Sequence, residues 1–125
     1  DTGDGGKFGY VDGMVASVPD GKRQGFIDHA AKTARFSQEK GALGVVDGWG
    51  MDVPAGKVTD FKRAVQAKDG ETVVLGWVEW PDKPTREAGM SALMQNNRMR
   101  EMQPPWNGPL AIFGGFTPIL DTCHA

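Results

Sequence analysis

Cysteine is almost absent from this chain, which excludes two common ways of stabilising a small domain. Cys123 is its one cysteine, so the chain can form neither an internal disulfide nor a zinc cluster of cysteines. Long apolar runs are absent too, since none approaches the roughly 20 residues of a membrane-spanning helix. The N-terminal residues also lack the basic-then-apolar order of a signal peptide. We therefore expect a reduced, soluble, cytoplasmic protein with no membrane partner.

An excess of basic residues is missing as well. Fourteen Lys and Arg stand against sixteen Asp and Glu, which gives a formal net charge of −2. Because binding to a phosphate backbone normally shows as a clustered excess of Lys and Arg, we expect no nucleic-acid partner. The basic side chains between positions 57 and 68 are interpreted as a solvated loop, with a patch for an anionic ligand or RNA as the alternative.

Motifs for cofactors and metals are also missing. The chain has no G-x-x-x-x-G-K-[ST] phosphate loop, and its two histidines, His29 and His124, lack the i,i+4 spacing of a metal pair. We therefore expect no cofactor and no metal site. His29 lies at the edge of the apolar stripe of a predicted helix. It is interpreted as a partly buried structural residue, with a general base or a ligand as the alternative.

What the chain does contain is the composition of one globular domain. It has 125 residues, of which 39% are hydrophobic and 24% are charged. That is enough for one core and leaves little room for a second. The Gly- and Asp-rich residues 1–6 are predicted to be a flexible tail, and residues 7–125 a single domain.

Hydrophobic periodicity predicts four strands and two helices. The strands are expected at 7–18, 42–52, 72–80 and 110–120. The helices are expected from an Asp20 N-cap to Gly41 and from Asp82 or Thr85 to Pro104, with Met99 and Met102 in a last turn and a short extra turn capped by Asp60. This order is that of a ferredoxin-like βαββαβ sandwich of the α+β class. It implies an antiparallel sheet in the order 4-1-3-2 with both helices on one face.

Alternation along the strands predicts one bulky and one small face. The small face is expected beneath the helices, so that Val11, Val15, Val74 and Val78 pack against Phe26, Ala30, Met90 and Leu93. The bulky face is expected to carry Tyr10, Met14, Trp49, Trp77 and Phe116. A patch this apolar normally marks an interface. We therefore expect a homodimer in which two sheets meet face to face as a dimeric α/β barrel.

Short motifs recur in order and with nearly constant spacing from residue 10 to about residue 120. They include Tyr10-Val11-Asp12-Gly13, Gly41-Ala42-Leu43, Gly56-Lys57-Val58-Thr59, Glu71-Thr72-Val73-Val74, Arg86-Glu87 and Gly114-Gly115-Phe116. On these motifs the chain resembles the YbaA-like bacterial family of unknown function. The resemblance implies a dimeric α/β barrel of ferredoxin-like halves, and it implies no established activity.

Three positions depart from the pattern of that family. Met90 stands where the second helix often carries Asn, and Met51 replaces one of a pair of acidic residues. Asp47 takes the place of a longer acidic residue in the second strand. A polar site that depends on the Asn is therefore expected to be altered or absent.

Three carboxylates are the candidate catalytic residues: Asp12, Asp47 and Glu79. Strand parity places them together on the bulky face. Because a buried carboxylate is costly unless it is paired, the cluster predicts a pocket in which one carboxylate has a raised pKa and acts as a general base. The alternative is that each pairs with Arg or Lys as a structural ion pair. The candidate ligand-binding walls are Tyr10, Trp49, Trp77 and Phe116.

Two classes of function stay open. One is an enzyme or binder that acts on a small aromatic or enolic molecule in the barrel cavity, by analogy with cofactor-independent monooxygenases of this architecture. The other is a non-catalytic dimeric binding or interaction module. A lined cavity favours the first class, and a filled barrel interior favours the second. Met90 and Met94 are interpreted as core, with a flexible apolar binding site as the alternative. Trp106 is a loop residue that can cover a neighbouring subunit or the mouth of a pocket.

Overall fold

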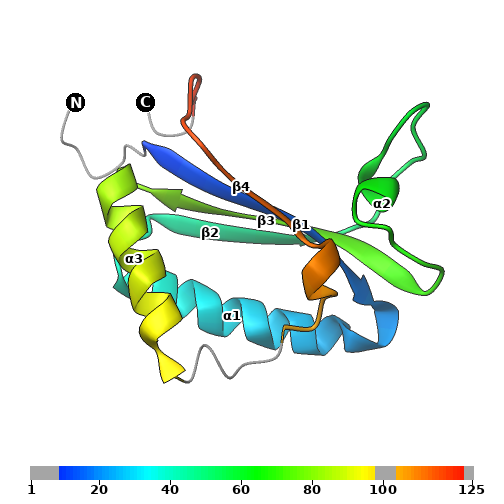
Figure 1. The fold of residues 1–125 in the computed structure, drawn as a ribbon, viewed down its shortest axis with the longest axis horizontal. Coiled ribbons are helices and arrows are strands. Elements are labelled where there is room, and N and C mark those ends of the chain that lie inside the picture. Colours follow the sequence, from blue (N-terminus) through cyan, green and yellow to red (C-terminus); the bar gives the residue numbers. More distant parts are fainter. Residues whose placement is uncertain (1–8, 98–103, 123–125) are drawn as a thin grey trace.

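The computed structural model describes residues 9–97 and 104–122, whose arrangement Figure 1 shows. The strands are β1 (Tyr10–Pro19), β2 (Gly44–Trp49), β3 (Glu71–Trp80) and β4 (Ile112–Phe116). The helices are η1 (Asp20–Lys22), α1 (Arg23–Glu39), α2 (Phe61–Ala64), α3 (Lys83–Gln95) and η2 (Gly108–Leu110). The predicted tail at 1–6 and the predicted helical turn with Met99 and Met102 lie outside the described residues. Among the helices of the described ranges, none is long and apolar enough to cross a membrane.

The four strands form one antiparallel sheet in the order β2-β3-β1-β4, and α1 and α3 lie together on one side of it (Figure 1). This confirms the ferredoxin-like α+β fold and the predicted strand order. The central strands β1 and β3 pair over ten residues each. The edge strands are shorter than predicted, and β4 ends before Pro118, which has no N–H to donate to a ladder.

The pairing register sorts the side chains onto two faces in a way the sequence did not predict. Asp12 of β1 lies opposite Val78 of β3, and Asp47 of β2 lies opposite Gly76 of β3. Since directly paired residues point to the same face, the even positions of β1 share a face with the even positions of β3 and the odd positions of β2. The predicted bulky face is therefore wrong, because it aligned even positions of β1 with odd positions of β3.

The even positions of β1 lie under the helices, where the core is. The buried core cluster consists of Ala16, Val18, Phe26 and Val74. Val74 thus packs against α1 as predicted. Val11 and Val15 do not, because their odd positions in β1 point away from the helices. Half of the predicted packing between sheet and helices is therefore wrong, for the same reason of register.

The helix ends follow their predicted signals in two cases and depart in one. The backbone N–H of Thr85 donates to Asp82 Oδ1 at 2.7 Å, so Asp82 is the N-cap of α3. Gly41 follows α1 with a φ of 110°, a left-handed conformation that glycine adopts easily. Asp20 is not an N-cap, since a 3-10 turn precedes α1. The Asp20 carboxylate instead accepts a hydrogen bond of 2.5 Å from the Thr72 hydroxyl.

The sheet face opposite α1 and α3 is called the open face here. Three strands supply its exposed apolar side chains, which are Val46, Leu75, Trp77, Ile112 and Phe116. The short helix α2, capped by Asp60 as predicted, lies on this side of the sheet near the end where β1 finishes and β3 starts (Figure 1). Of the side chains predicted for an apolar interface, Trp77 and Phe116 lie on the open face. Tyr10, Met14 and Trp49 lie on the helix-covered face instead.

Candidate functional site

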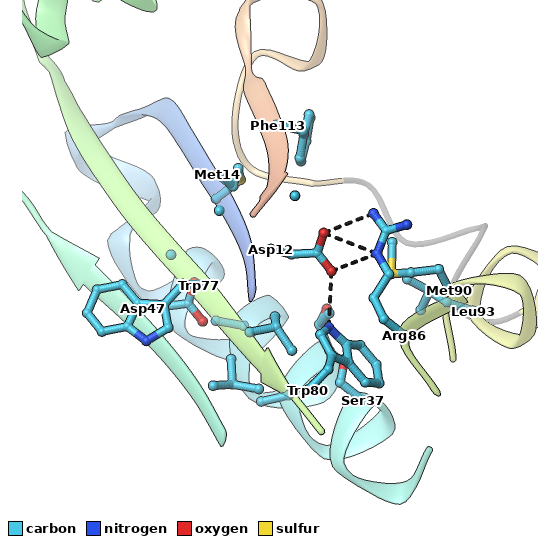
Figure 2. Close-up of a pocket in the computed structure, with 18 of the residues that line it drawn as sticks. Asp12, Met14, Ser37, Asp47, Trp77, Trp80, Arg86, Met90, Leu93 and Phe113 are labelled. Carbon is cyan, nitrogen blue, oxygen red and sulfur yellow. Dashed lines mark hydrogen bonds and ion pairs between the residues drawn. The ribbon is translucent and has the colours of Figure 1, made fainter. Parts of the chain in front are cut away.

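A cavity of about 560 Å³ lies between the sheet and the helix layer (Figure 2). The sheet contributes Asp12 from β1 and Asp47 from β2, while α1 and α3 contribute Ser37 and Arg86. Apolar side chains form most of the rest of the wall, among them Met14, Trp80, Met90, Leu93, Trp106 and Phe113. The predicted cavity was inside a dimer barrel. The observed cavity is on the other side of the sheet, because the register points Asp12 and Asp47 toward the helices.

Asp12 is held in a bidentate ion pair that joins β1 to α3. Arg86 Nε and Nη2 donate to its two carboxylate oxygens at 2.9 Å each, and Trp80 Nε1 donates a further hydrogen bond at 3.0 Å (Figure 2). The side chains of Arg86 and Asp12 are only 23% and 19% exposed. Two parallel charge-assisted bonds fix orientation as well as distance. For Asp12 the geometry favours the structural ion pair over the catalytic base.

The guanidinium of Arg86 also contacts protein groups on the side that faces away from Asp12. Its Nη1 donates to Glu87 Oε1 at 2.9 Å, and its carbon centre lies 5.5 Å from the centroid of the Tyr10 ring. The hydrogen bonds to Asp12 are the main cause that raises the pKa of Arg86 above its ordinary value. Arg86 is therefore a permanent cation, and each of its three guanidinium nitrogens donates to a protein carboxylate.

Asp47 has a different environment at the other end of the cavity. A Cβ placed on Gly76 would collide with Asp47 Oδ1, so the carboxylate occupies the space that the missing side chain leaves free. Although Asp47 is partly exposed, the burial of its cavity side raises the pKa of this carboxyl. Among residues 9–97 and 104–122, no group donates a hydrogen bond or forms an ion pair to it. Asp47 is thus a partly desolvated carboxylate without a partner in the described part of the chain.

His29 on α1 supplies a third polar group to the cavity wall. Its ring lies edge-on to Trp106 with 5.0 Å between the ring centroids. Burial, and secondarily the charge of Lys32, lowers the pKa of His29, so its imidazole is neutral at pH 7. The contact fits the structural interpretation of His29. It also places Trp106 at the cavity, as expected for a loop residue that covers a pocket.

The predicted catalytic carboxylates are separated by the sheet. Asp12 and Asp47 share the cavity, but Glu79 lies on the open face. There its carboxylate accepts a hydrogen bond from Trp77 Nε1 at 3.1 Å. Placing Glu79 beside Asp12 was wrong, because Glu79 pairs with Val11 rather than with an even position of β1.

The predicted aromatic walls are separated as well. Trp77 and Phe116 belong to the open face, where both line a shallow depression, although Trp77 also contributes to the wall of the cavity (Figure 2). Trp49 packs on Phe26 with 6.1 Å between the ring centroids, and Tyr10 lies beside Arg86. These four side chains therefore do not form one ligand-binding wall.

Arg86, Trp80 and Phe113 are cavity residues that sequence reasoning did not assign to a site, although Arg86 belongs to one of the motifs shared with the family. Arg86 lies 74 positions from Asp12, and no local pattern links the two. For Trp80 a signal existed, because it shares strand parity with Val74 and Val78, which were expected beneath the helices. Within the described ranges, no group of three His, Cys, Asp or Glu side chains is placed to hold a metal ion.

Comparison with known proteins shows to which family the chain belongs. Residues 9–108 match the model of a family described as protein of unknown function (DUF1428). The chain belongs to this family. Its relatives include the uncharacterized protein YbaA of Escherichia coli K12 and that of Shigella flexneri, each 45% identical over 114 residues. Those residues cover 90% of this chain and 97% of each relative, which confirms the resemblance to the YbaA-like family.

Two solved structures share the fold. One is a dimeric ferredoxin-like protein from an uncultured marine organism, with a TM-score of 0.61 and 14% identity, covering 93% of this chain and all of that one. The other is SnoaB, a cofactor-independent oxygenase from Streptomyces nogalater, with a TM-score of 0.53 and 16% identity, covering 90% of this chain and 96% of that one. At these identities the likeness shows the fold alone.

Proposed function

We propose that the cavity binds a small aromatic phenol or enol and that Asp47 accepts its proton. The observation that carries this proposal is the position of Asp47, a carboxylate with a raised pKa at an apolar cavity. A base needs a free lone pair and is helped by a pKa closer to the working pH; the lack of an ion pair leaves the lone pair free, and burial raises the pKa. Asp12 cannot do this work while Arg86 and Trp80 occupy its oxygens.

The chemistry that follows from this base is an oxygenation without a cofactor. Removal of a proton leaves an electron-rich enolate, whose carbon forms a bond to dioxygen. The peroxide anion then takes the proton back from Asp47, so that substrate and dioxygen combine into a hydroperoxide. Likeness in fold to SnoaB, a cofactor-independent oxygenase, supports this class of reaction as an analogy.

Proton exchange on a bicyclic aromatic ketone tests the base directly. We expect the protein to speed deuterium exchange at the acidic carbon of 2-tetralone, and Asp47→Asn to slow it by at least about 100-fold. Proton NMR in deuterated buffer measures the rate. The matched control is Asp52→Asn, an exposed carboxylate outside the cavity, which should leave the rate unchanged. An unchanged rate in Asp47→Asn would show that this residue is not the base.

The pH dependence of that exchange should report the raised pKa of Asp47. A base works in its ionised form, so the rate falls as acid protonates it. Because burial raises the pKa above the ordinary value of 3.8, the fall should be centred at a higher pH than for an exposed aspartate.

The contribution of Asp47 to the free energy of unfolding changes in the opposite direction. It becomes more favourable as acid protonates the carboxyl, because the neutral form does not carry the cost of burying a charge. Replacing Asp47 with Asn should therefore keep or raise the free energy of unfolding at pH 7, and a midpoint at or below pH 3.8 would contradict this assignment.

We propose further that two copies of the chain associate through the open face. Five exposed apolar side chains from three strands gather there, which is more than a solvated sheet normally shows. A sheet-on-sheet dimer would cover them and leave both cavities accessible from the helix side. The dimeric ferredoxin-like protein of similar fold supports this assembly as an analogy. A non-catalytic dimeric module is the alternative function, and it would follow if the cavity bound no aromatic compound.

A further inference from the structure

We propose that the cavity selects its occupant by charge, taking uncharged aromatic alcohols and excluding the corresponding carboxylates. This inference rests on the proposed function, because it names the kind of molecule that the same cavity takes. It depends on two observations: how the one cation of the described wall is used, and which other charges face the cavity.

The first observation is that the pair of Arg86 donors best placed to bind a carboxylate, Nε and Nη2, is already taken by Asp12. Its Nε and Nη2 are bonded to Asp12, and its Nη1 is bonded to Glu87 at 2.9 Å. A guanidinium commonly binds carboxylate ligands through two parallel hydrogen bonds. Here Asp12 already accepts those two parallel hydrogen bonds. A ligand carboxylate would have to displace a protein carboxylate that is also bonded to Trp80.

The second observation is the balance of charge on the wall. Among its described residues, the ionisable side chains are two carboxylates, Asp12 and Asp47, one guanidinium, Arg86, and the imidazole of His29. The imidazole is neutral at pH 7, and the guanidinium is offset by Asp12. An entering anion would therefore lose its water and meet the like charge of Asp47. An uncharged hydroxyl group would meet a hydrogen-bond acceptor in the same place.

Binding of two compounds that share a naphthalene ring and differ in its substituent tests this selection. Isothermal titration at pH 7 compares 1-naphthol, which is uncharged, with 1-naphthoate, which carries one negative charge. We expect wild-type protein to bind 1-naphthol at least about tenfold more tightly than 1-naphthoate. Asp12→Asn releases Arg86, so it should tighten 1-naphthoate binding by about tenfold and leave 1-naphthol binding nearly unchanged.

A second variant allows the same test if Asp12→Asn does not fold. Met90→Lys places a cation at the cavity wall without touching the pair of Asp12 and Arg86, and it should also strengthen binding of 1-naphthoate. Equal affinity of wild type for both compounds would overturn charge selection and leave the proposed function standing. Absence of any gain for 1-naphthoate in both folded variants would also overturn it. Absence of 1-naphthol binding to wild-type protein would overturn charge selection as well, whereas binding of 1-naphthol without Asp47-dependent exchange of 2-tetralone would count against the proposed function alone.

Discussion

Asp12→Asn is expected to lower the free energy of unfolding by about 2 to 3 kcal/mol. The substitution keeps the size of the side chain and removes its charge. Arg86 is then left largely buried beside a neutral amide, with its two strongest hydrogen bonds weakened. Urea denaturation followed by tryptophan fluorescence measures the change, since Trp80 itself bonds to Asp12.

A matched exposed carboxylate shows whether this loss comes from the ion pair. Asp28 on α1 is exposed and accepts a hydrogen bond from Gln24 one turn away, so Asp28→Asn should change stability by about 0.5 kcal/mol or less. A double-mutant cycle of Asp12→Asn with Arg86→Gln then isolates the coupling between the two side chains. If Asp12→Asn changed stability no more than Asp28→Asn, the pair would not be the structural tie between β1 and α3.

The fold was predictable because its signals are local or follow from chain order. Alternation marks the central strands, and the sequence β-α-β, link, β-α-β leaves few ways to arrange four strands with both helices on one side. Helix ends marked by Asp82 and Gly41 were predictable for the same reason. Asp20 failed because its carboxylate found a partner 52 residues away, in Thr72.

The faces of the sheet were not predictable from alternation alone. Parity within one strand says which residues share a side, but the pairing register decides which sides of two strands coincide. Trp77 looked like a partner of Asp12 because both belong to the bulky side of their own strands. The register instead pairs Asp12 with Val78 and turns Trp77 to the other face. One parity choice therefore misplaced the cavity as a whole.

The different roles of Asp12 and Asp47 were not predictable either. Asp47 was found because a carboxylate among apolar strand positions is unusual wherever that face points. The features that separate its role from that of Asp12 are contacts between distant elements. One is the space above Gly76, and the other is the reach of Arg86 from α3 to β1. Neither contact can be predicted from the spacing of residues along the chain. The sequence therefore predicted Asp12 and Asp47 as candidates, and the contacts show which of them is paired.

The two faces of the sheet give the protein two separable properties. The cavity lies on the helix side of the sheet, and the proposed dimer surface lies on the open face. Leu75 lies between Val15 of β1 and Gly48 of β2 on that open face and is 41% exposed. A change there should affect association of the chains and leave the cavity intact.

Leu75→Glu is expected to weaken dimer formation by at least about 100-fold. In a face-to-face dimer this position lies near the middle of an interface of roughly 1,600 Å², where a carboxylate would lose its water without gaining a partner. Sedimentation equilibrium should therefore shift from twice the chain mass of 13.5 kDa toward that mass. Titration of 1-naphthol into the same variant should still show binding, because the cavity lies on the opposite side of the sheet.

The control for this prediction is the same substitution on the helix layer. Ile27 of α1 is 44% exposed, close to the exposure of Leu75, and lies on the other side of the molecule. Ile27→Glu introduces the same charge at the same exposure, so general effects of charge on solubility and stability are matched. We expect it to stay dimeric. A wild-type chain that sediments as a monomer at micromolar concentration, or equal dissociation of both variants, would remove the open face as the dimer surface and leave its five apolar side chains for a different partner.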